Sequence, residues 1–283
     1  MSANAVYLAP GQGETVFSVS SSPIKFGAGA LAELGMDAQA LRMKRVALFV
    51  DPHVLASPAG ETALAALRGA GLDAVVFDRV RCEPNSDSFE EAAAFARDGH
   101  FDGFVSLGGG SVMDTAKAAN LLASWPDELI AYVNAPIGKA KPIPGKLKPH
   151  IACPTTCGTG SETTGITILD LKSAGLKTGI ASPLLKPMLA IVDPLTTESL
   201  PGGVVAASGF DVLCHACESY TARPFTSRPR PAHPSQRPPY QGSTPYNDIG
   251  ALAAIRNASA LGERRRTRHS PQLKSIIRAL DSS

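Results

Sequence analysis

The sequence predicts an α/β protein, with a parallel β-sheet over roughly the first 200 residues and a helical region after it. Short apolar runs at 46–50 and 103–107 alternate along the chain with segments that have helical spacing. Apolar runs without polar alternation are typical of parallel strands that are covered on both faces. From Gly202 onward the spacing is helical, which places a domain boundary near residue 200.

The elements alternate in the order that right-handed βαβ crossovers require, and such crossovers set the strands parallel with helices on both sides. The first strand or pair of strands is expected within 15–27, with a turn at Pro23. The other expected strands, besides the two runs above, are 74–78, 150–154 and 189–193. The expected helices are 27–41, 62–70, 88–98 and 112–123. Residues 166–170 and 177–182 alternate like a β-hairpin.

Composition and charge are those of an ordinary soluble globular protein. The 283 residues are 44% hydrophobic and 18% charged, and 27 Lys and Arg against 25 Asp and Glu leave a formal net charge of +2. This balance gives no reason to expect nucleic acid or a membrane as a partner. An odd number of cysteines, five, favours a reducing compartment, and neither a signal peptide nor a membrane span is visible. We therefore expect a soluble intracellular protein.

Three glycines and a helix follow the strand at 103–107. Gly109, Gly110 and Ser111 begin that helix, where free backbone amides attract phosphate and missing Cβ atoms let a ligand approach. A tight turn that uses glycine for positive φ explains the same residues equally well. The spacing is not G-x-G-x-x-G, so the usual dinucleotide fingerprint is absent although the order of strand, turn and helix is present.

Two further polar positions follow strands of the predicted sheet. Asp51 stands where such sheets hold an acid for a ribose hydroxyl, although an Asp-Pro turn is the alternative. If a nucleotide binds, this acid favours NAD over NADP, because it repels a 2′-phosphate. The second position is the loop at 155–162, whose four hydroxyls could contact ribose or phosphate: Thr155, Thr156, Thr159 and Ser161.

Asp211 and His215 form an i, i+4 pair within GFDVLCHACESY at 209–220. On a helix both side chains leave the same face and could hold one cation, although D-x-x-x-H is also frequent by chance. Cys214 and Cys217 form a C-x-x-C in the same helix. Zinc knuckles lie on turns and redox pairs lie at helix N-termini, so we interpret these two thiols as packing groups.

Four motifs, in this order, resemble the iron-containing (group III) alcohol dehydrogenase family: GGGSVMDTAK at 108–117, PTTCGTGSE at 154–162, IVDP at 191–194 and GFDVLCHACESY at 209–220. Within the family the sequence is most similar to the hydroxyacid-oxoacid transhydrogenases, through segments such as EPNSDSFEEA at 83–92 and PPYQGSTPYNDI at 238–249. The resemblance extends from about residue 16 to about residue 256. It implies a dehydroquinate synthase-like architecture, in which an α/β dinucleotide-binding domain precedes an all-helical metal-binding domain.

The resemblance also implies a role for each candidate residue. Gly109, Gly110 and Ser111 would hold the pyrophosphate of NAD, Asp51 the adenosine ribose, and Asp114 would steady the glycine loop. The residues that would line the path to the nicotinamide are Thr155, Thr156, Thr159 and Ser161. Lys177 is placed with the cofactor-binding residues as a positive charge near the site; an ordinary surface lysine is the alternative.

The metal and the reaction are likewise implied by the resemblance. Asp211 and His215 would be two ligands of a divalent ion, Fe²⁺ first and Zn²⁺ as the alternative, and no other catalytic residue is assigned. The reaction would be hydride transfer through NAD between small hydroxyacids and oxoacids, such as 4-hydroxybutyrate and 2-oxoglutarate. An inactive NAD-binding fragment and a general iron-type alcohol dehydrogenase are the alternatives, while a dehydroquinate synthase-like lyase would require a different metal triad. A homodimer is expected, in the cytoplasm or, in a eukaryote, in the mitochondrial matrix.

The sequence departs from the family towards its end. The family's other two metal ligands are histidines further along the chain, but His233 lies in a loop rich in Pro and Arg and His269 in a basic stretch. We therefore expect four parts: a flexible N-terminus (1–15), the dinucleotide-binding domain (16–200), the beginning of the helical domain (201–256, with the loop 222–245) and a divergent basic tail (257–283). The change after Arg256 suggests a truncated or frame-shifted helical domain, and a coding sequence without a histidine-rich continuation in any frame would contradict this hypothesis.

Overall fold

The structure is a computed structural model that describes residues 13–266, without the side chains of Ser235 and 260–266. Most of the predicted N-terminal segment, and the basic tail beyond Arg266 with His269, lie outside the described residues. The chain forms two compact units. We call residues 21–156 and 160–200 the sheet unit, and residues 13–20, 157–159 and 201–266 the helix-pair unit.

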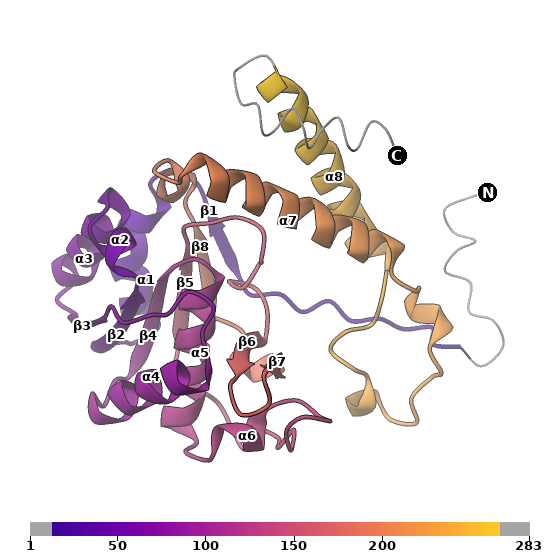
Figure 1. The fold of residues 1–283 in the computed structure, drawn as a ribbon, viewed down its shortest axis with the longest axis horizontal. Helices are drawn as coiled ribbons and strands as arrows, with labels where there is room; N and C mark the ends of the chain where they lie inside the picture. Colours follow the sequence, from indigo (N-terminus) through magenta and orange to yellow (C-terminus); the bar gives the residue numbers. More distant parts are fainter. Residues whose placement is uncertain (1–12, 267–283) are drawn as a thin grey trace. The chain divides into compact units, whose positions relative to one another are not determined.

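The sheet unit is built on six parallel strands in the order β1-β8-β5-β4-β2-β3 (Figure 1). The strands are β1 (Ile24–Phe26), β2 (Arg45–Val50), β3 (Asp73–Phe77), β4 (Gly103–Gly108), β5 (His150–Pro154) and β8 (Leu189–Val192). All six residues of β4 and all five of β5 are buried, as the apolar runs predict for strands covered on both faces. The predicted parallel α/β sheet is therefore confirmed.

Helices cover both faces of this sheet. On one face α1 (Leu34–Ala40) and α3 (Pro58–Gly69) contribute to an apolar cluster with Leu48 and Val50 of β2. On the other face α4 (Ser86–Asp98) and α5 (Gly110–Ser124) pack with Phe49 of the same strand. Alternate residues of β2 thus enter different cores, because successive side chains of a strand point to opposite faces.

Smaller elements complete the sheet unit. A two-stranded antiparallel hairpin forms from β6 (Ile166–Leu171) and β7 (Leu176–Ala181), as the alternation predicts. The short helices are α2 (Pro52–Leu55), α6 (Leu129–Tyr132), η2 (Ala30–Glu33), η3 (Pro183–Leu185) and η4 (Pro194–Thr197).

All four predicted helices begin at other residues in the structure, and two of them differ most. The helix expected at 27–41 begins only at Ala30, as the 3₁₀ turn η2, because Gly29 precedes it in a left-handed conformation with φ of 84°. The helix expected at 62–70 begins earlier, at Pro58, because the Ser57 hydroxyl accepts the Gly60 amide and Pro58 occupies the first turn. Both differences lie at helix starts, where local capping outweighs apolar spacing.

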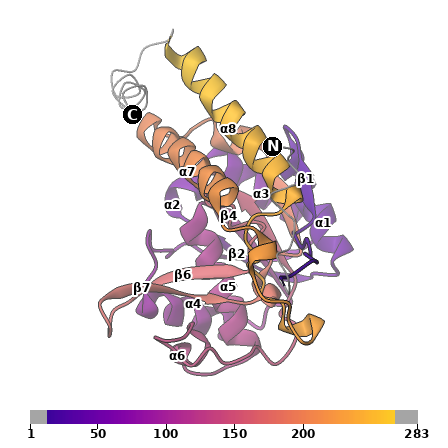
Figure 2. The same cartoon turned by 90° about the vertical axis from the view of Figure 1, so that its right-hand side faces the viewer.

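The helix-pair unit contains α7 (Gly202–Thr221) and α8 (Pro245–Arg266), which contact each other and lie side by side in Figure 2. Residues 222–244 join them as an irregular segment with two 3₁₀ turns, η5 (Phe225–Ser227) and η6 (Pro234–Gln236). Among the described residues, no helix is both long enough and apolar enough to span a bilayer.

Candidate functional site

The polar positions that follow β2, β4 and β5 lie at one edge of the sheet. Val50 is in register with Leu107, and Gly108 with Pro154, so the three strands end at the same level. Asp51, Gly109 and Thr155 therefore follow neighbouring strands directly. The chain leaves β2 for β3 on one side and returns to β4 on the other, and open α/β sheets bind their ligands at such a switch point, beyond the carboxyl ends of the strands.

The N-terminus of α5 is made of glycine and serine. Gly109 is the N-cap residue, without a side-chain cap, and Gly110 opens a helix of 15 residues. A Cβ atom on Gly109 would lie 3.2 Å from Thr156 Oγ1, so a side chain there would crowd the loop after β5. The first amides of a helix have no acceptor within it, and they attract an anion. The geometry can therefore hold a phosphate group.

Ser111 is oriented by the segment that precedes α4. Its Oγ accepts a hydrogen bond from the backbone N–H of Glu83 at 3.1 Å. The Glu83 side chain in turn lies 3.5 Å from Lys177 Nζ, on the exposed surface of β7. This chain of contacts brings Lys177 to the neighbourhood of the α5 N-terminus, although the ammonium already has a carboxylate partner.

Asp51 caps a helix. Its Oδ1 accepts hydrogen bonds from the backbone N–H groups of His53 and Val54, both at 3.0 Å, and Pro52 begins α2. This is the Asp-Pro turn that the sequence left open. Because both bonds go to Oδ1, the turn and a contact of Oδ2 with a ribose hydroxyl are compatible.

Asp114 links α5 to β6 and to Ser161 in the loop after β5. Its Oδ2 accepts the backbone N–H of Ile168 at 3.0 Å, and its main-chain oxygen accepts the Thr167 hydroxyl at 2.9 Å. Burial raises the pKa of Asp114 to about 6, against the opposing effects of Lys117 and of a hydrogen bond from Ser161. Thr155, also buried, donates its N–H to Gly108 O at 3.0 Å. The loop and the glycine turn are thereby tied together.

Lys117 belongs to this network, and our reasoning from the sequence did not single it out. Its side chain is fully buried, with Nζ 2.9 Å from Ile166 O, 3.4 Å from Thr164 Oγ1 and 4.0 Å from Asp114 Oδ1. Burial lowers the pKa of Lys117 to about 8, while the Asp114 carboxylate opposes that shift. The available signal was the i, i+3 spacing of an acid and a base within GGGSVMDTAK.

A second buried polar pair was also missed. His150 Nε2 lies 2.8 Å from Ser106 Oγ, between neighbouring strands of the sheet. Burial lowers the pKa of His150 to about 3, so the ring is neutral at physiological pH. A neutral imidazole that is hydrogen-bonded to a hydroxyl inside the sheet has a structural role. The apolar pattern of the strand did not indicate this pair.

The α7 helix brings Asp211 and His215 together. Asp211 Oδ1 lies 3.6 Å from His215 Nε2, and both side chains are exposed, by 40% and 54%. Two donors at ~2.1 Å from one ion in tetrahedral geometry lie about 3.4 Å apart, so a carboxylate and an imidazole in this arrangement fit one divalent cation. Among the described residues, no group of three or more His, Cys, Asp or Glu is placed to hold a metal. The pair thus supplies part of a coordination sphere.

The neighbours of this pair have separate roles. Cys214 and Cys217 are exposed free thiols on α7, so the prediction that they are packing groups is wrong: at these helical positions their side chains face outward. Thr159 is exposed and belongs to the same unit as α7. His233 is exposed and lies in the segment 222–244, where its backbone N–H donates to Gln236 Oε1 at 3.1 Å.

Comparison with known proteins assigns the family. The model of the iron-containing alcohol dehydrogenases matches residues 21–194. The mitochondrial hydroxyacid-oxoacid transhydrogenase of Bos taurus is 52% identical over 242 residues, which are 85% of this chain and 52% of that protein. The chain thus spans about half the length of that relative.

Solved structures agree with this assignment. A 1,3-propanediol oxidoreductase aligns with a TM-score of 0.76 and 27% identity, over 92% of this chain and 62% of its own. The sulfoacetaldehyde reductase of Bifidobacterium kashiwanohense, solved in complex with NAD⁺, aligns with a TM-score of 0.67 and 31% identity, over 73% of this chain and 53% of its own. The family match covers more than half of the sequence, and the parallel sheet with its glycine turn agrees with it. The chain belongs to the iron-containing alcohol dehydrogenase family.

Proposed function

We propose that this chain binds NAD at the carboxyl edge of β2, β4 and β5, and that it takes part in metal-dependent hydride transfer between hydroxyacids or alcohols and oxoacids or aldehydes. The observation that carries the proposal is the Asp211–His215 pair on α7, in a chain that is 52% identical to a hydroxyacid-oxoacid transhydrogenase. The NAD⁺ complex of the Bifidobacterium relative supports the choice of cofactor.

Each residue of the sheet edge has a defined task in this proposal. The amides of Gly110 and Ser111 would bind the pyrophosphate, with Gly109 leaving room for it. Asp51 would accept a ribose hydroxyl through the oxygen that does not cap α2. The residues that would hold or line the nicotinamide side are Asp114, Thr155, Thr156, Thr159, Ser161 and Lys177.

Asp211 and His215 would hold a divalent ion through one oxygen and one nitrogen. Fe²⁺ is the first choice and Zn²⁺ the second, because both accept carboxylate and imidazole ligands. When bound, the ion would polarise a carbonyl or stabilise an alkoxide, and NAD would carry the hydride. The protein's own contribution is to orient the two ligands on one helical face and to fix the loop next to them.

The name of the relatives supports a hydroxyacid as hydride donor and an oxoacid as acceptor. We propose 4-hydroxybutyrate as hydride donor and 2-oxoglutarate as acceptor. The names of the structural neighbours favour a second candidate, a general alcohol dehydrogenase that releases NADH. An NAD-binding protein without turnover is the third, because the described residues supply only two metal ligands. We also propose a homodimer, located in the cytoplasm or in the mitochondrial matrix of a eukaryote; the mitochondrial name of the relatives supports the second location.

One experiment separates these candidates. The purified chain is loaded with Fe²⁺ or Zn²⁺, and bound metal, bound NAD and conversion of 4-hydroxybutyrate with 2-oxoglutarate are measured. Stoichiometric metal with paired formation of the aldehyde and the 2-hydroxyacid supports the transhydrogenase, and NADH release with a simple alcohol supports the dehydrogenase. NAD binding without metal or product supports the inactive form, and the absence of NAD binding contradicts the proposal. His215→Ala should lose metal while its control, His233→Ala, keeps it.

A further inference from the structure

The helix-pair unit contains a cavity of about 280 Å³ between the N-terminal segment and the irregular segment after α7. Its wall is formed by Glu14 on one side and by residues between Phe225 and Gln241 on the other, with three arginines among them: Arg228, Arg230 and Arg237. None of the residues proposed above for NAD or metal lines this cavity.

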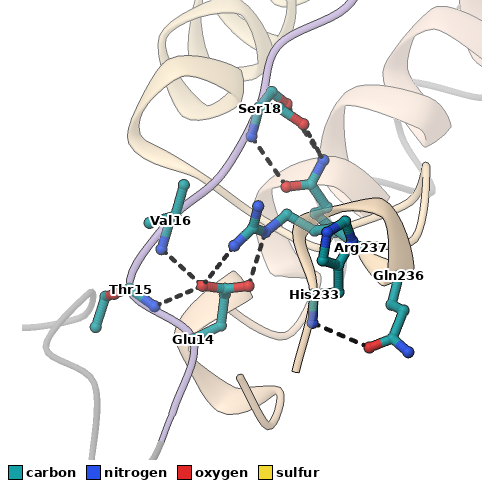
Figure 3. Close-up of polar contacts among 8 residues, drawn as sticks. Glu14, Thr15, Val16, Ser18, His233, Gln236 and Arg237 are labelled. Carbon is teal, nitrogen blue, oxygen red and sulfur yellow. Dashed lines mark hydrogen bonds and ion pairs between the residues drawn. The ribbon is translucent and has the colours of Figure 1, made fainter. Parts of the chain in front are cut away.

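The wall of the cavity is held by links between distant parts of the chain (Figure 3). The Glu14 carboxylate is buried and accepts hydrogen bonds from the backbone N–H groups of Thr15 at 3.0 Å and Val16 at 2.9 Å, and from Arg237 Nε at 2.8 Å. Gln241 and Ser18 exchange hydrogen bonds at 3.0 Å, with the Ser18 N–H donating to Gln241 Oε1 and Gln241 Nε2 bonded to Ser18 Oγ. The cavity is thus bounded by a fixed framework.

The wall of the cavity carries more positive than negative charges, with three arginines and one carboxylate. Glu14 neutralises Arg237, and the hydrogen bond from that guanidinium holds the pKa of Glu14 at about 2, so the pair stays ionised at neutral pH. Arg228 lies over the ring of Tyr240, with its Cζ 5.5 Å from the ring centroid. Among the described residues, no carboxylate forms an ion pair with Arg228 or Arg230, and the sequence has no Asp or Glu between Glu218 and Asp248. Two positive charges are left at the cavity.

We propose that this cavity binds a small organic dianion, whose acidic groups are held by Arg228 and Arg230 and whose carbon atoms lie against Phe225 and the proline rings. Guanidinium groups bind carboxylate and phosphate through charge-assisted hydrogen bonds. At roughly 30 Å³ per water molecule the cavity has room for about nine waters, which suits a short dicarboxylate or a small phosphate compound. This site is additional to the proposed active site.

Titration calorimetry on the full chain, freed of metal with EDTA and without NAD, tests the site with two probes, succinate and inorganic phosphate. We expect saturable binding of at least one probe, with an affinity that falls as NaCl is raised. Binding of succinate alone identifies a dicarboxylate site and binding of phosphate alone a phosphate site; both outcomes support the proposal. Removal of metal and NAD keeps this result independent of the proposed catalytic activity.

Substitutions then locate the binding. Arg230→Gln and Arg228→Gln should each weaken the affinity about tenfold, because each removes one charged donor. Arg230→Lys should keep part of it, and Arg223→Gln, an arginine of the same segment that does not line the cavity, should leave it unchanged. Circular dichroism checks that each variant is folded. Absence of binding to the wild-type chain, or equal affinities for the variants of Arg223, Arg228 and Arg230, would overturn the proposal.

Discussion

Gly158 lies against the turn of α7 that carries Asp211. Its φ is +129°, and a Cβ atom there would lie 2.7 Å from Asp211 Oδ2 and 3.0 Å from Ser208 O. A contact as short as the first essentially never occurs for a real Cβ atom, the second is unusually tight, and this φ is strained for residues with a side chain. Only glycine therefore lets the loop approach the helix closely enough to limit the positions of the Asp211 carboxylate.

Gly158→Ala should weaken metal binding about tenfold and lower the free energy of unfolding by roughly 1–3 kcal/mol, because the methyl group displaces Asp211 and strains the backbone. Titration of Zn²⁺ followed by calorimetry, together with urea unfolding, measures both quantities. Gly209→Ala is the matched control. It lies within α7 with open space at its Cβ position, so we expect unchanged metal affinity and a gain of up to about 1 kcal/mol. Equal metal affinity for the two variants would contradict a positioning role for Gly158.

The buried pair of Asp114 and Lys117 makes the sheet unit sensitive to pH. The pKa of Asp114 is raised in the folded state, so the fold favours the protonated carboxyl group. Its contribution to the free energy of unfolding is therefore fully present below the ordinary pKa and is lost as the pH rises through about 6. Lys117 has a lowered pKa, so its contribution is lost as the pH falls from its ordinary value through about 8. Between pH 6 and 8 both groups are charged and compensate each other.

Lys117→Met should destabilise the protein more at pH 8 than at pH 5. Without the ammonium the pKa of Asp114 rises further. Above about pH 6 the free energy of unfolding of the variant therefore falls more steeply than that of the wild type, because ionising the buried carboxyl group costs more. Urea unfolding at the two pH values measures the difference. The exposed Lys172→Met, which removes a surface ion pair with Asp87, should show little dependence on pH in this range. A destabilisation by Lys117→Met that is the same at pH 5 and pH 8 would exclude the coupling.

For single residues, the sequence predicts which side chains can act together better than it predicts which residues they contact in the fold. The i, i+4 spacing of Asp211 and His215 sufficed to predict that they share a helix face. The burial of Lys117 did not follow from any spacing, because lysines on helices usually face solvent and its acceptors, Thr164 and Ile166, lie just before and at the start of β6, far away in the sequence. The approach of Gly158 to Asp211 is likewise a result of tertiary packing.

At the scale of the elements, the N-terminus of α5 shows how the space around a helix start favours one type of residue. Gly109 has φ of −80° and ψ of −173°, which any residue can adopt, so glycine is favoured there by space and not by backbone strain. The space is that between the helix start and Thr156.

Gly109→Ala should therefore leave the fold intact and reduce the affinity for NAD about tenfold, because a methyl group intrudes where the phosphates approach the amides. Quenching of protein fluorescence by NAD measures the dissociation constant, and thermal unfolding checks the fold. Gly69→Ala, at the end of α3 with open space around its Cβ position, is the control and should keep its affinity. Unchanged NAD binding by Gly109→Ala would exclude this helix start as the phosphate site.

The elements themselves were predictable because burial on both faces leaves a clear pattern. The runs at 46–50 and 103–107 lie within β2 and β4, and the crossovers set them parallel. The first residue of a helix was harder to predict than the presence of the helix. Ser57 and Pro58 make α3 begin earlier than predicted, and Gly29 makes η2 begin later. A cap or a left-handed glycine acts on a single turn, whereas the periodicity of apolar residues averages over several turns.

For the molecule as a whole, the helix-pair unit is assembled from both ends of the described chain. Glu14 accepts the guanidinium of Arg237, and the pKa of Glu14 is lowered to about 2, so this contribution to stability is present above the ordinary pKa of a carboxyl group and is lost only as the pH falls through about 2. The interaction is therefore intact over the whole physiological range.

Glu14→Gln should loosen this unit selectively. With Arg237 unpaired, amide hydrogen exchange at pH 7 should accelerate in residues 13–18 and 225–241 and stay unchanged in β4 and β5. Exchange followed by mass spectrometry resolves these segments. Glu33→Gln, which removes an exposed partner of Lys25 in the sheet unit, should leave both segments unaffected. Acceleration throughout the chain would instead indicate that Glu14 stabilises the protein globally.

The link between Ser18 and Gln241, like that between Glu14 and Arg237, joins residues that are 223 positions apart. A ribosome adding about 5–20 residues per second completes Gln241 roughly 10–45 s after Ser18. During that time the strands of the sheet, all of which lie between these positions, can already be synthesised and paired. The segment around Ser18 is thus synthesised before every strand of the sheet, yet it is among the last to find its partners, and the arginine-lined cavity forms only after Gln241 has been added.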